Sequence, residues 1–192
     1  MKRTVLAGVG AGAAAFVISD VVNSEMSPIA EPISRFVNTG AGWLVPLGML
    51  AMALAATALT VTVARIGTSR VGASLLGIWS LGLLLSAVFP ADPPGQWDDP
   101  SAVDTVHGLS ACLGLLAFTA AAVLLTRAWP RDALLTGIAV VLVSGMILFV
   151  VTLVDVMAVR SLPPLVGLTE RIVVAAGLGW MAVAAVRLTP AD

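Results

Sequence analysis

The chain has 192 residues, of which 59% are hydrophobic and 11% are charged, with a net charge of −1 and a mean hydropathy of +1.03. Soluble domains carry about 25% charged residues, so this chain has too few charges to cover a surface that faces water. The composition excludes a soluble enzyme, a disordered protein and a nucleic-acid-binding protein, and it predicts an all-α, polytopic membrane helical bundle.

Apolar runs separated by Pro, Gly and charged residues predict six transmembrane helices in a single domain. Their predicted bounds are 4–22, 43–64, 71–89, 107–126, 134–154 and 171–188. The first run begins like a signal peptide, with a basic start and small residues, but we expect a membrane helix. Within it, Gly8 and Gly12 have a spacing that lets helix backbones approach closely. They predict packing inside the bundle or, as the alternative, the contact face of a homo-oligomer.

Basic residues predict the orientation of the helices, because Lys and Arg resist translocation across the membrane. If both termini are cytoplasmic, seven basic residues lie inside, namely Lys2, Arg3, Arg65, Arg70, Arg127, Arg131 and Arg187. Three then lie outside, namely Arg35, Arg160 and Arg171. Most acids gather on the outer side, namely Asp20, Glu25, Glu31, Asp92, Asp98, Asp99, Asp104, Asp155 and Glu170. We expect a multi-pass plasma-membrane protein whose functional face is extracytoplasmic.

The connection before the second predicted helix holds Arg35, Asn38 and Trp43. Amphipathic residues flank Arg35, so this stretch is either a short helix lying on the outer surface or, as we prefer, a loop that returns to the membrane. Trp43 is the kind of residue that anchors a helix at the membrane interface. All three residues are candidates for ligand binding.

The connection before the fourth predicted helix holds a proline pair, Pro93-Pro94, which keeps Asp92 extended. Asp92 can therefore lie over the mouth of the bundle. His107 is the only histidine and opens the fourth predicted helix, with Asp104 three residues before it. A carboxylate beside an imidazole suits acid–base catalysis. The alternative is that Asp104 caps the helix while His107 makes a structural hydrogen bond.

The sixth predicted helix starts with Thr169, Glu170 and Arg171. Thr169 is a fair N-cap, and Glu170 suits the positive end of the helix dipole. An arginine that enters the membrane needs a partner, and the candidates are Asp155 and Asp20, at the ends of the fifth and first helices. Arg171 predicts either a site for an anionic head group or an ion pair between helices.

Metal and cofactor ligands are scarce in this sequence. One histidine and one cysteine do not make a zinc, iron or haem site of the usual ligand types, so we expect no cofactor and no metal. The cysteine, Cys112, lies inside an apolar run and is expected to be a small packing residue.

These polar stretches resemble an uncharacterised bacterial membrane family catalogued as domain of unknown function nine-nine-eight. The resemblance covers most of the chain and lies in Ser34 to Trp43, Phe89-Pro90-Ala91-Asp92, His107-Gly108 and Glu170-Arg171. It implies a six-helix fold with a polar cluster on the outer face, and it supplies no reaction. Members of the family often carry a second His one turn after the first, where this chain has Ser110-Ala111. The resemblance therefore does not imply a two-histidine metal site.

Three functions fit these features. The first is a membrane protein whose acidic outer pocket binds a lipid or small amphiphile, with Arg171 and Arg35 at the head group. The second is an intramembrane enzyme acting on a lipid or isoprenoid, for example a protonation-initiated terpenoid cyclase. Its candidate catalytic residues are Asp92, Asp104, His107 and Glu170, and its aromatic walls would come from Trp79, Trp97 and Trp180. The third, a proton-coupled transporter, ranks last because helices two to six have no acid at their centres.

Overall fold

The structure, a computed structural model, describes residues 1–129 and 132–188. Over these residues it is all-helical, and six helices are long and apolar enough to cross a membrane. They are α1 (Lys2–Val22), α2 (Leu44–Ile66), α3 (Arg70–Val88), α4 (Ala102–Ala128), α5 (Ala133–Val154) and α6 (Val166–Leu188). The predicted multi-pass helical fold is confirmed. Arg131 and Asp192, two charges that bear on the predicted orientation, lie outside the described residues.

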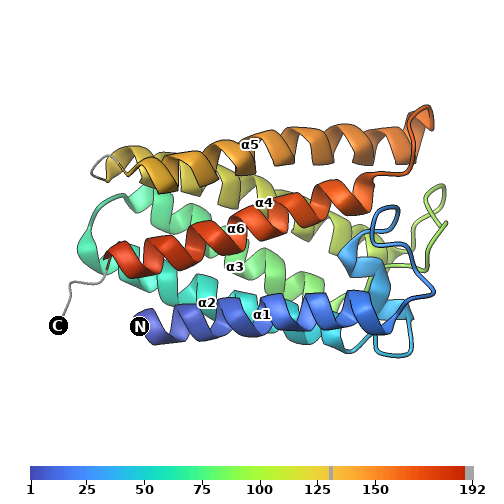
Figure 1. Ribbon diagram of the computed structural model, residues 1–192, viewed down its shortest axis with the longest axis horizontal. Coiled ribbons are helices and arrows are strands. Elements are labelled where there is room, and N and C mark those ends of the chain that lie inside the picture. Colours follow the sequence, from blue (N-terminus) through green and yellow to red (C-terminus); the bar gives the residue numbers. More distant parts are fainter. Residues whose placement is uncertain (130–131, 189–192) are drawn as a thin grey trace.

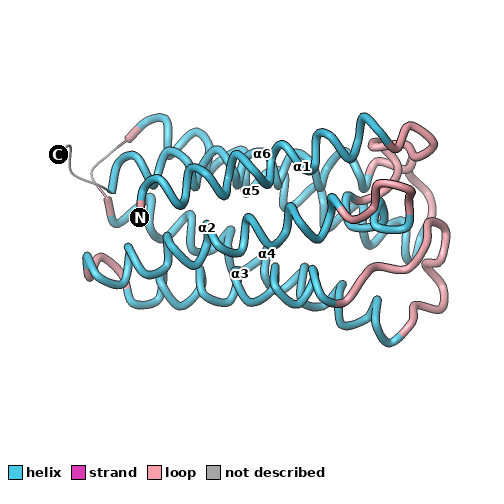
Figure 2. The backbone as a smooth tube through the Cα atoms, turned by 90° about the horizontal axis from the view of Figure 1, so that it is seen from below, coloured by secondary structure: helices cyan, strands magenta, loops and turns pink. Residues whose placement is uncertain are grey.

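The six helices form one elongated bundle in which each helix packs against the next along the chain (Figure 1). α6 packs against α5 and also against α1, which closes the bundle. α1 begins and α6 ends at the same end of the bundle (Figure 1). The longer connections, 23–43, 89–101 and 155–165, gather at the opposite end (Figure 2). We call this second end the long-loop end.

Apolar side chains fill the interior and also cover the exterior of the bundle. Leu59, Leu76 and Leu142 are fully buried, whereas Leu54 and Leu113 are more than 60% exposed. An exterior of this kind would be unstable in water, but lipid chains solvate it. The exposed apolar surface therefore fits a bundle that lies in a bilayer.

Glycines let α1 approach α2 closely. A Cβ on Gly8 would lie 2.6 Å from the carbonyl oxygen of Ala51, and one on Gly12 would lie 2.7 Å from Cγ of Met52. The two helices can approach this closely only because glycine has no side chain, as in other helix interfaces formed by small residues. This face of α1 is thus filled by α2 of the same chain, and association between chains stays a prediction.

α4 begins five residues before the predicted start, at Ala102 rather than at residue 107. Its N-cap is Ser101, whose hydroxyl accepts a hydrogen bond from the backbone N–H of Asp104 at 3.1 Å. The suggestion that Asp104 is the cap is therefore wrong. Hydropathy marks where an apolar run begins, whereas this helix begins at a polar cap that follows Pro100.

α6 also begins early, at Val166 rather than at residue 171. Thr169 is thus not the N-cap, and its hydroxyl lies 2.8 Å from that of Thr152 on α5. Gly167, in the first turn of α6, is required by packing. A Cβ at this position would collide with the backbone carbonyl of Glu31.

The stretch around Arg35 forms a 3-10 helix, η1 (Ile33–Asn38), and not the loop that we preferred. It does not lie on the surface either, because Ile33 and Phe36 are buried. Residues three apart share one face of a 3-10 helix, so these two side chains point together into the bundle. η1 therefore closes the long-loop end from within.

Candidate functional site

Arg35 joins η1 to the 89–101 connection. It is only 3% exposed, and its Nη1 and Nη2 donate to the carbonyl oxygens of Pro93 and Gln96 at 2.8 and 3.0 Å. The guanidinium also lies over the ring of Trp97, 3.6 Å from its centroid. Burial lowers the pKa of Arg35, and nearby carboxylates partly offset this effect. Arg35 thus holds the loop over the long-loop end.

Asp92 closes the base of the same loop. Its carboxylate accepts from the backbone N–H of Ser101 at 2.6 Å and from the Ser101 hydroxyl at 2.8 Å. These two donors hold the pKa of Asp92 below its ordinary value. The backbone N–H of Asp92 in turn donates to Oδ1 of Asp104 at 3.1 Å. Asp92 is therefore engaged in closing the loop.

His107 is 4% exposed and faces the end of α3. Its Nδ1 lies 3.0 Å from the carbonyl oxygen of Ser86 and 2.7 Å from that of Phe89. Carbonyl oxygens only accept hydrogen bonds, so Nδ1 carries a proton, and Nε2 is an acceptor in the tautomer that holds this proton alone. Among the described residues, no group bonds Nε2, and Asp104 does not contact the ring through a hydrogen bond.

Glu170 lies on the first turns of α6, next to the start of η1. Its Oε2 accepts from the backbone N–H of Ile33 at 2.6 Å. No other hydrogen bond to this carboxylate occurs within the described part of the chain. Glu170 is therefore half-buried between two elements, and one of its oxygens has no hydrogen-bond partner among the described residues.

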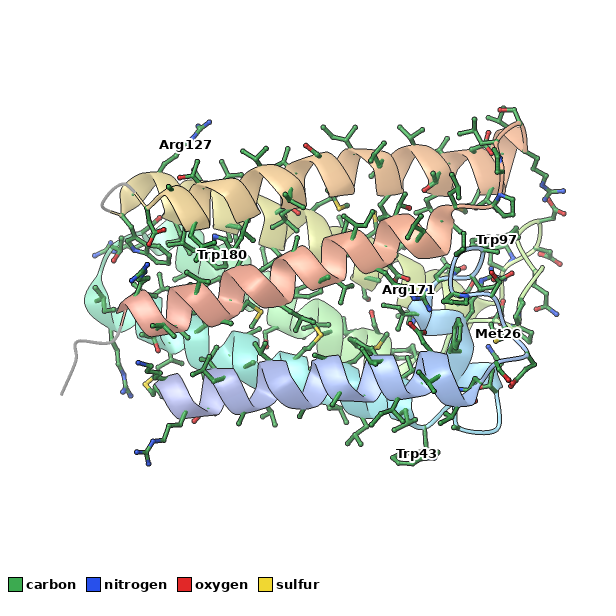
Figure 3. The ribbon with its side chains drawn as sticks, viewed as in Figure 1. Met26, Trp43, Trp97, Arg127, Arg171 and Trp180 are labelled. Atoms are coloured by element: carbon green, nitrogen blue, oxygen red, sulfur yellow. The ribbon has the colours of Figure 1, made fainter. Side chains whose placement is uncertain are left out.

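Arg171 pairs with Asp20, not with Asp155, and so joins α6 to α1 (Figure 3). Its Nε and Nη2 donate to the two carboxylate oxygens of Asp20 at 2.8 and 2.6 Å. Its Nη1 donates to the carbonyl oxygens of Glu31 and Gly167 at 2.9 and 3.1 Å. Every nitrogen of this guanidinium is thus bonded within the chain.

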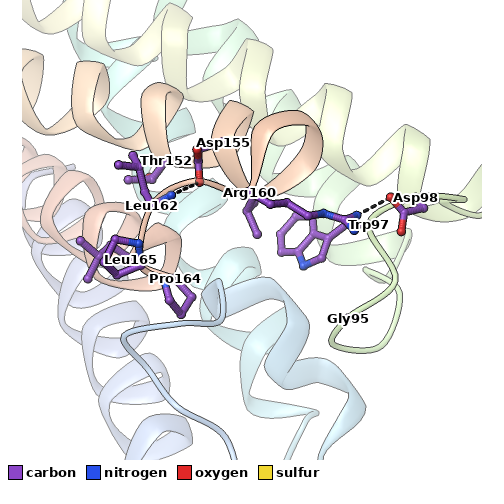
Figure 4. Close-up of a pocket in the computed structure, with 11 residues that line it drawn as sticks. Gly95, Trp97, Asp98, Thr152, Asp155, Arg160, Leu162, Pro164 and Leu165 are labelled. Atoms are coloured by element: carbon purple, nitrogen blue, oxygen red, sulfur yellow. Dashed lines mark hydrogen bonds and ion pairs between the residues drawn. The ribbon is translucent and has the colours of Figure 1, made fainter.

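Asp155 ends α5 and caps the turn that follows it. Its carboxylate accepts from the N–H and hydroxyl of Ser161. It also accepts from the N–H of Leu162 (Figure 4). Beside it, a surface pocket of about 320 Å³ is crossed by the ion pair between Arg160 and Asp98. This ion pair fastens the turn to the 89–101 connection.

Two further predicted residues lie around η1. The amide of Asn38 donates to the carbonyl oxygens of Arg35 and Ala91, both at 3.1 Å. Trp43 is 64% exposed and points away from the bundle (Figure 3). Asn38 therefore supports the loop contacts, and Trp43 lies where lipid would surround it.

One cavity of about 340 Å³ brings part of the predicted site together. It lies between the long-loop ends of α4 and α5, below the 89–101 connection, and we call it the long-loop cavity. Four of the predicted site residues line it, namely Arg35, Asp104, His107 and Glu170. The others do not, namely Asp20, Asn38, Trp43, Asp92, Asp155 and Arg171.

Apolar side chains from α4, α5 and the turn after α5 form a further part of the wall of the long-loop cavity. Phe149 and Leu153 line it on the α5 side, and Leu109 and Met157 lie at its rim. Leu109 is 60% and Met157 48% exposed, on the surface that would face lipid. The cavity thus combines a charged interior with an apolar opening toward the membrane.

Ser34, Cys112 and the whole α5 wall of this cavity are site residues that the sequence did not predict. Phe149 and Leu153 do not differ in sequence from the other apolar residues of α5. They belong to the site only because the fold places them in the cavity that His107 also lines. Among the residues that the structure describes, no three His, Cys, Asp or Glu side chains gather in a way that could hold a metal ion.

The chain was compared with known proteins. No curated protein and no solved structure matches it. The model of a family described as proteins of unknown function, DUF998, matches residues 6–187. This match covers nearly the whole bundle, including η1, the 89–101 connection and the long-loop cavity. The chain therefore belongs to the DUF998 family of proteins of unknown function.

Proposed function

We propose that the protein binds a lipid or a small amphiphile in the long-loop cavity, at the extracytoplasmic face of the plasma membrane. The observation that carries the proposal is the division of this cavity into two chemistries. The buried ring of His107 and the half-buried carboxylate of Glu170 lie inside, and apolar side chains of Leu109 and Met157 lie at a lipid-exposed rim. An amphiphile has the same division between head group and tail.

The size and position of the cavity support the proposal. Its volume of about 340 Å³ falls at the small end of ligand pockets, which span about 300–1,000 Å³. A tail extending between α4 and α5 would remain partly in lipid, so the cavity needs to enclose only the head group and the first part of the chain. The extracytoplasmic placement rests on the excess of basic residues at the other end of the bundle.

Cys112 offers a direct test, because it is the only cysteine and lines the long-loop cavity. The rate of its alkylation by a membrane-permeant maleimide is measured in phosphatidylcholine vesicles with and without added single-chain amphiphiles. We expect at least one amphiphile to slow the reaction about fivefold or more at saturation.

The control moves the thiol out of the cavity. In the variant Cys112→Ser/Leu54→Cys the cysteine faces lipid on α2, where Leu54 is 65% exposed. Amphiphiles should leave its alkylation rate unchanged. Equal protection of both thiols would show a general membrane effect and would contradict the proposal, as would the absence of protection at Cys112 by any of them.

A steric pair of variants supplies a second test. A Cβ on Gly108 meets no atom within 4 Å, and this residue lines the cavity. Gly108→Leu should therefore fold and reduce the protection of Cys112. Gly10 is equally open but lies on the outside of α1, so Gly10→Leu should leave protection unchanged. Protection that is the same in both variants would place the ligand elsewhere.

An acid–base enzyme acting on a lipid or isoprenoid is the second candidate. The specific observation in its favour is that Asp104, His107 and Glu170 line one cavity. Trp97 adds an aromatic wall, whereas Trp180 packs away from the cavity against Trp129. If the protein is an enzyme, vesicles containing it should convert an isoprenoid to a product seen by mass spectrometry. Glu170→Gln should then abolish turnover, while the isoprenoid still protects Cys112 from alkylation. Unchanged turnover would exclude a catalytic role for Glu170.

A further inference from the structure

The groups that line the long-loop cavity indicate which head group it suits. We propose, on the basis of the proposed function, that the bound amphiphile carries an amine, which Glu170 and Asp104 bind through their carboxylates. In the Nδ1–H tautomer of His107, Nε2 provides a further acceptor. This differs from the anionic head group that the arginines suggest in the sequence.

Both arginines near the site are already engaged by the protein. All three guanidinium nitrogens of Arg171 are bonded to Asp20 and to two backbone carbonyls, and Arg171 does not line the cavity. Arg35 lines it, but its two terminal nitrogens each donate to a carbonyl of the 89–101 connection, and Trp97 covers one face. An anionic head group could therefore reach only the remaining N–H groups of Arg35, in a cavity that two carboxylates also line.

The acceptors that face the cavity, by contrast, are incompletely bonded. Glu170 receives one hydrogen bond, from Ile33 to Oε2, and Asp104 receives one, from Asp92 to Oδ1. Their second oxygens and Nε2 of His107 have no partner among the described residues. A group with several N–H donors could satisfy all three acceptors, which a carboxylate or a phosphate could not.

Charge favours the same head group. The lining holds one cation, Arg35, and two carboxylates, Asp104 and Glu170. No ion pair joins either carboxylate to a cation within the described residues. Both carboxylates are half-buried, and a bound ammonium would supply the counter-charge that favours a carboxylate partly removed from water. A second anion in the same space would instead repel both carboxylates.

The experiment compares three amphiphiles of equal tail length, dodecylamine, dodecanol and dodecanoate, in zwitterionic phosphatidylcholine vesicles. Each is titrated against the alkylation of Cys112, and its concentration in the membrane is measured separately. We expect dodecylamine to protect Cys112 at about tenfold or more lower membrane concentration than dodecanoate, with dodecanol between them, as one charge-assisted hydrogen bond would produce.

Variants connect the preference to the cavity. Glu170→Gln should weaken protection by dodecylamine about tenfold and that by dodecanol no more than about twofold. Asp104→Asn should act in the same direction and provides the test if Glu170→Gln does not fold. Glu25 is an exposed acid at the same end of the bundle, and Glu25→Gln should change nothing.

The possible outcomes separate the two proposals. Equal protection by all three amphiphiles, or a preference for dodecanoate, would overturn the amine assignment while leaving the amphiphile-binding function in place. If Glu25→Gln abolished the preference for the amine, that preference would come from surface charge, and the amine assignment would also be overturned. No protection by any of the three would overturn the proposed function, and the amine assignment with it.

Discussion

Replacing Arg171 by alanine should destabilise the bundle rather than remove a ligand. The substitution deletes four hydrogen bonds and leaves the carboxylate of Asp20 without its cation. The pair joins residues at the long-loop ends of α1 and α6, which close the bundle. Its removal therefore opens the contact between the first and the last helix.

The loss of stability expected for Arg171→Ala depends on how deeply the ion pair is buried. Breaking a buried ion pair by removing one partner costs about 3–5 kcal/mol. The Arg171 and Asp20 side chains are 17% and 24% exposed, so we expect the lower limit, about 3 kcal/mol. For a chain of this length, this corresponds to a fall in Tm of roughly 6–12 °C.

Thermal unfolding in detergent micelles, followed by tryptophan fluorescence, measures this change. The comparison includes Arg171→Ala, Asp20→Ala and the double variant, which should be little worse than either single variant. Arg187→Ala serves as the control, because Arg187 is 57% exposed in its ion pair with Asp132, and it should change Tm very little. Single effects that simply add, or an unchanged Tm in Arg171→Ala, would refute the structural role of the pair.

Three further changes should alter Tm in the same assay. Asp92→Asn should lower Tm near pH 6, because the Ser101 donors stabilise the ionised carboxylate and lower the pKa of folded Asp92. The difference in Tm from the unsubstituted protein should shrink as the pH falls below about 3.8. A difference that stays constant with pH would contradict this explanation. Burial raises the pKa of Glu31, so the ionised carboxylate destabilises the folded protein. Glu31→Gln should therefore raise Tm more at pH 8 than at pH 4. A larger increase at pH 4 would refute this role of Glu31. Gly167→Ala should lower Tm by several degrees, because the added Cβ would collide with the Glu31 carbonyl. Gly137→Ala should leave Tm unchanged, because a Cβ at that position meets no atom within 4 Å. Equal effects of the two substitutions would contradict the close packing at Gly167.

The helices could be predicted from the sequence because a membrane-spanning segment must be long and apolar. Their starts could not, because the cap at Ser101 and the packing of Gly167 are local interactions that hydropathy does not report. The burial of η1, which the sequence placed in a surface helix or a loop, could not be predicted for a related reason. Its burial depends on the connection that covers it, which follows more than fifty residues later in the chain.

The site was predictable only in its polar part. Sequence pattern identified Asp104, His107 and Glu170, which the fold then places around one cavity. It could not choose between Asp20 and Asp155 as the partner of Arg171, because that choice depends on which helix lies beside α6. Nor could it identify Phe149, whose apolar side chain becomes part of a cavity wall only through the packing of α5.

Photo-crosslinking tests the amphiphile-binding function most directly. A dodecylamine with a diazirine on its tail is illuminated in vesicles containing the protein, and the modified residues are mapped by mass spectrometry. Binding in the long-loop cavity predicts that labelling concentrates on residues 108–115 of α4 and on residues 149–157, at the end of α5 and in the turn after it. Excess dodecylamine should compete with this labelling. Labelling spread evenly over the lipid-exposed faces of all six helices, unaffected by competitor, would contradict it.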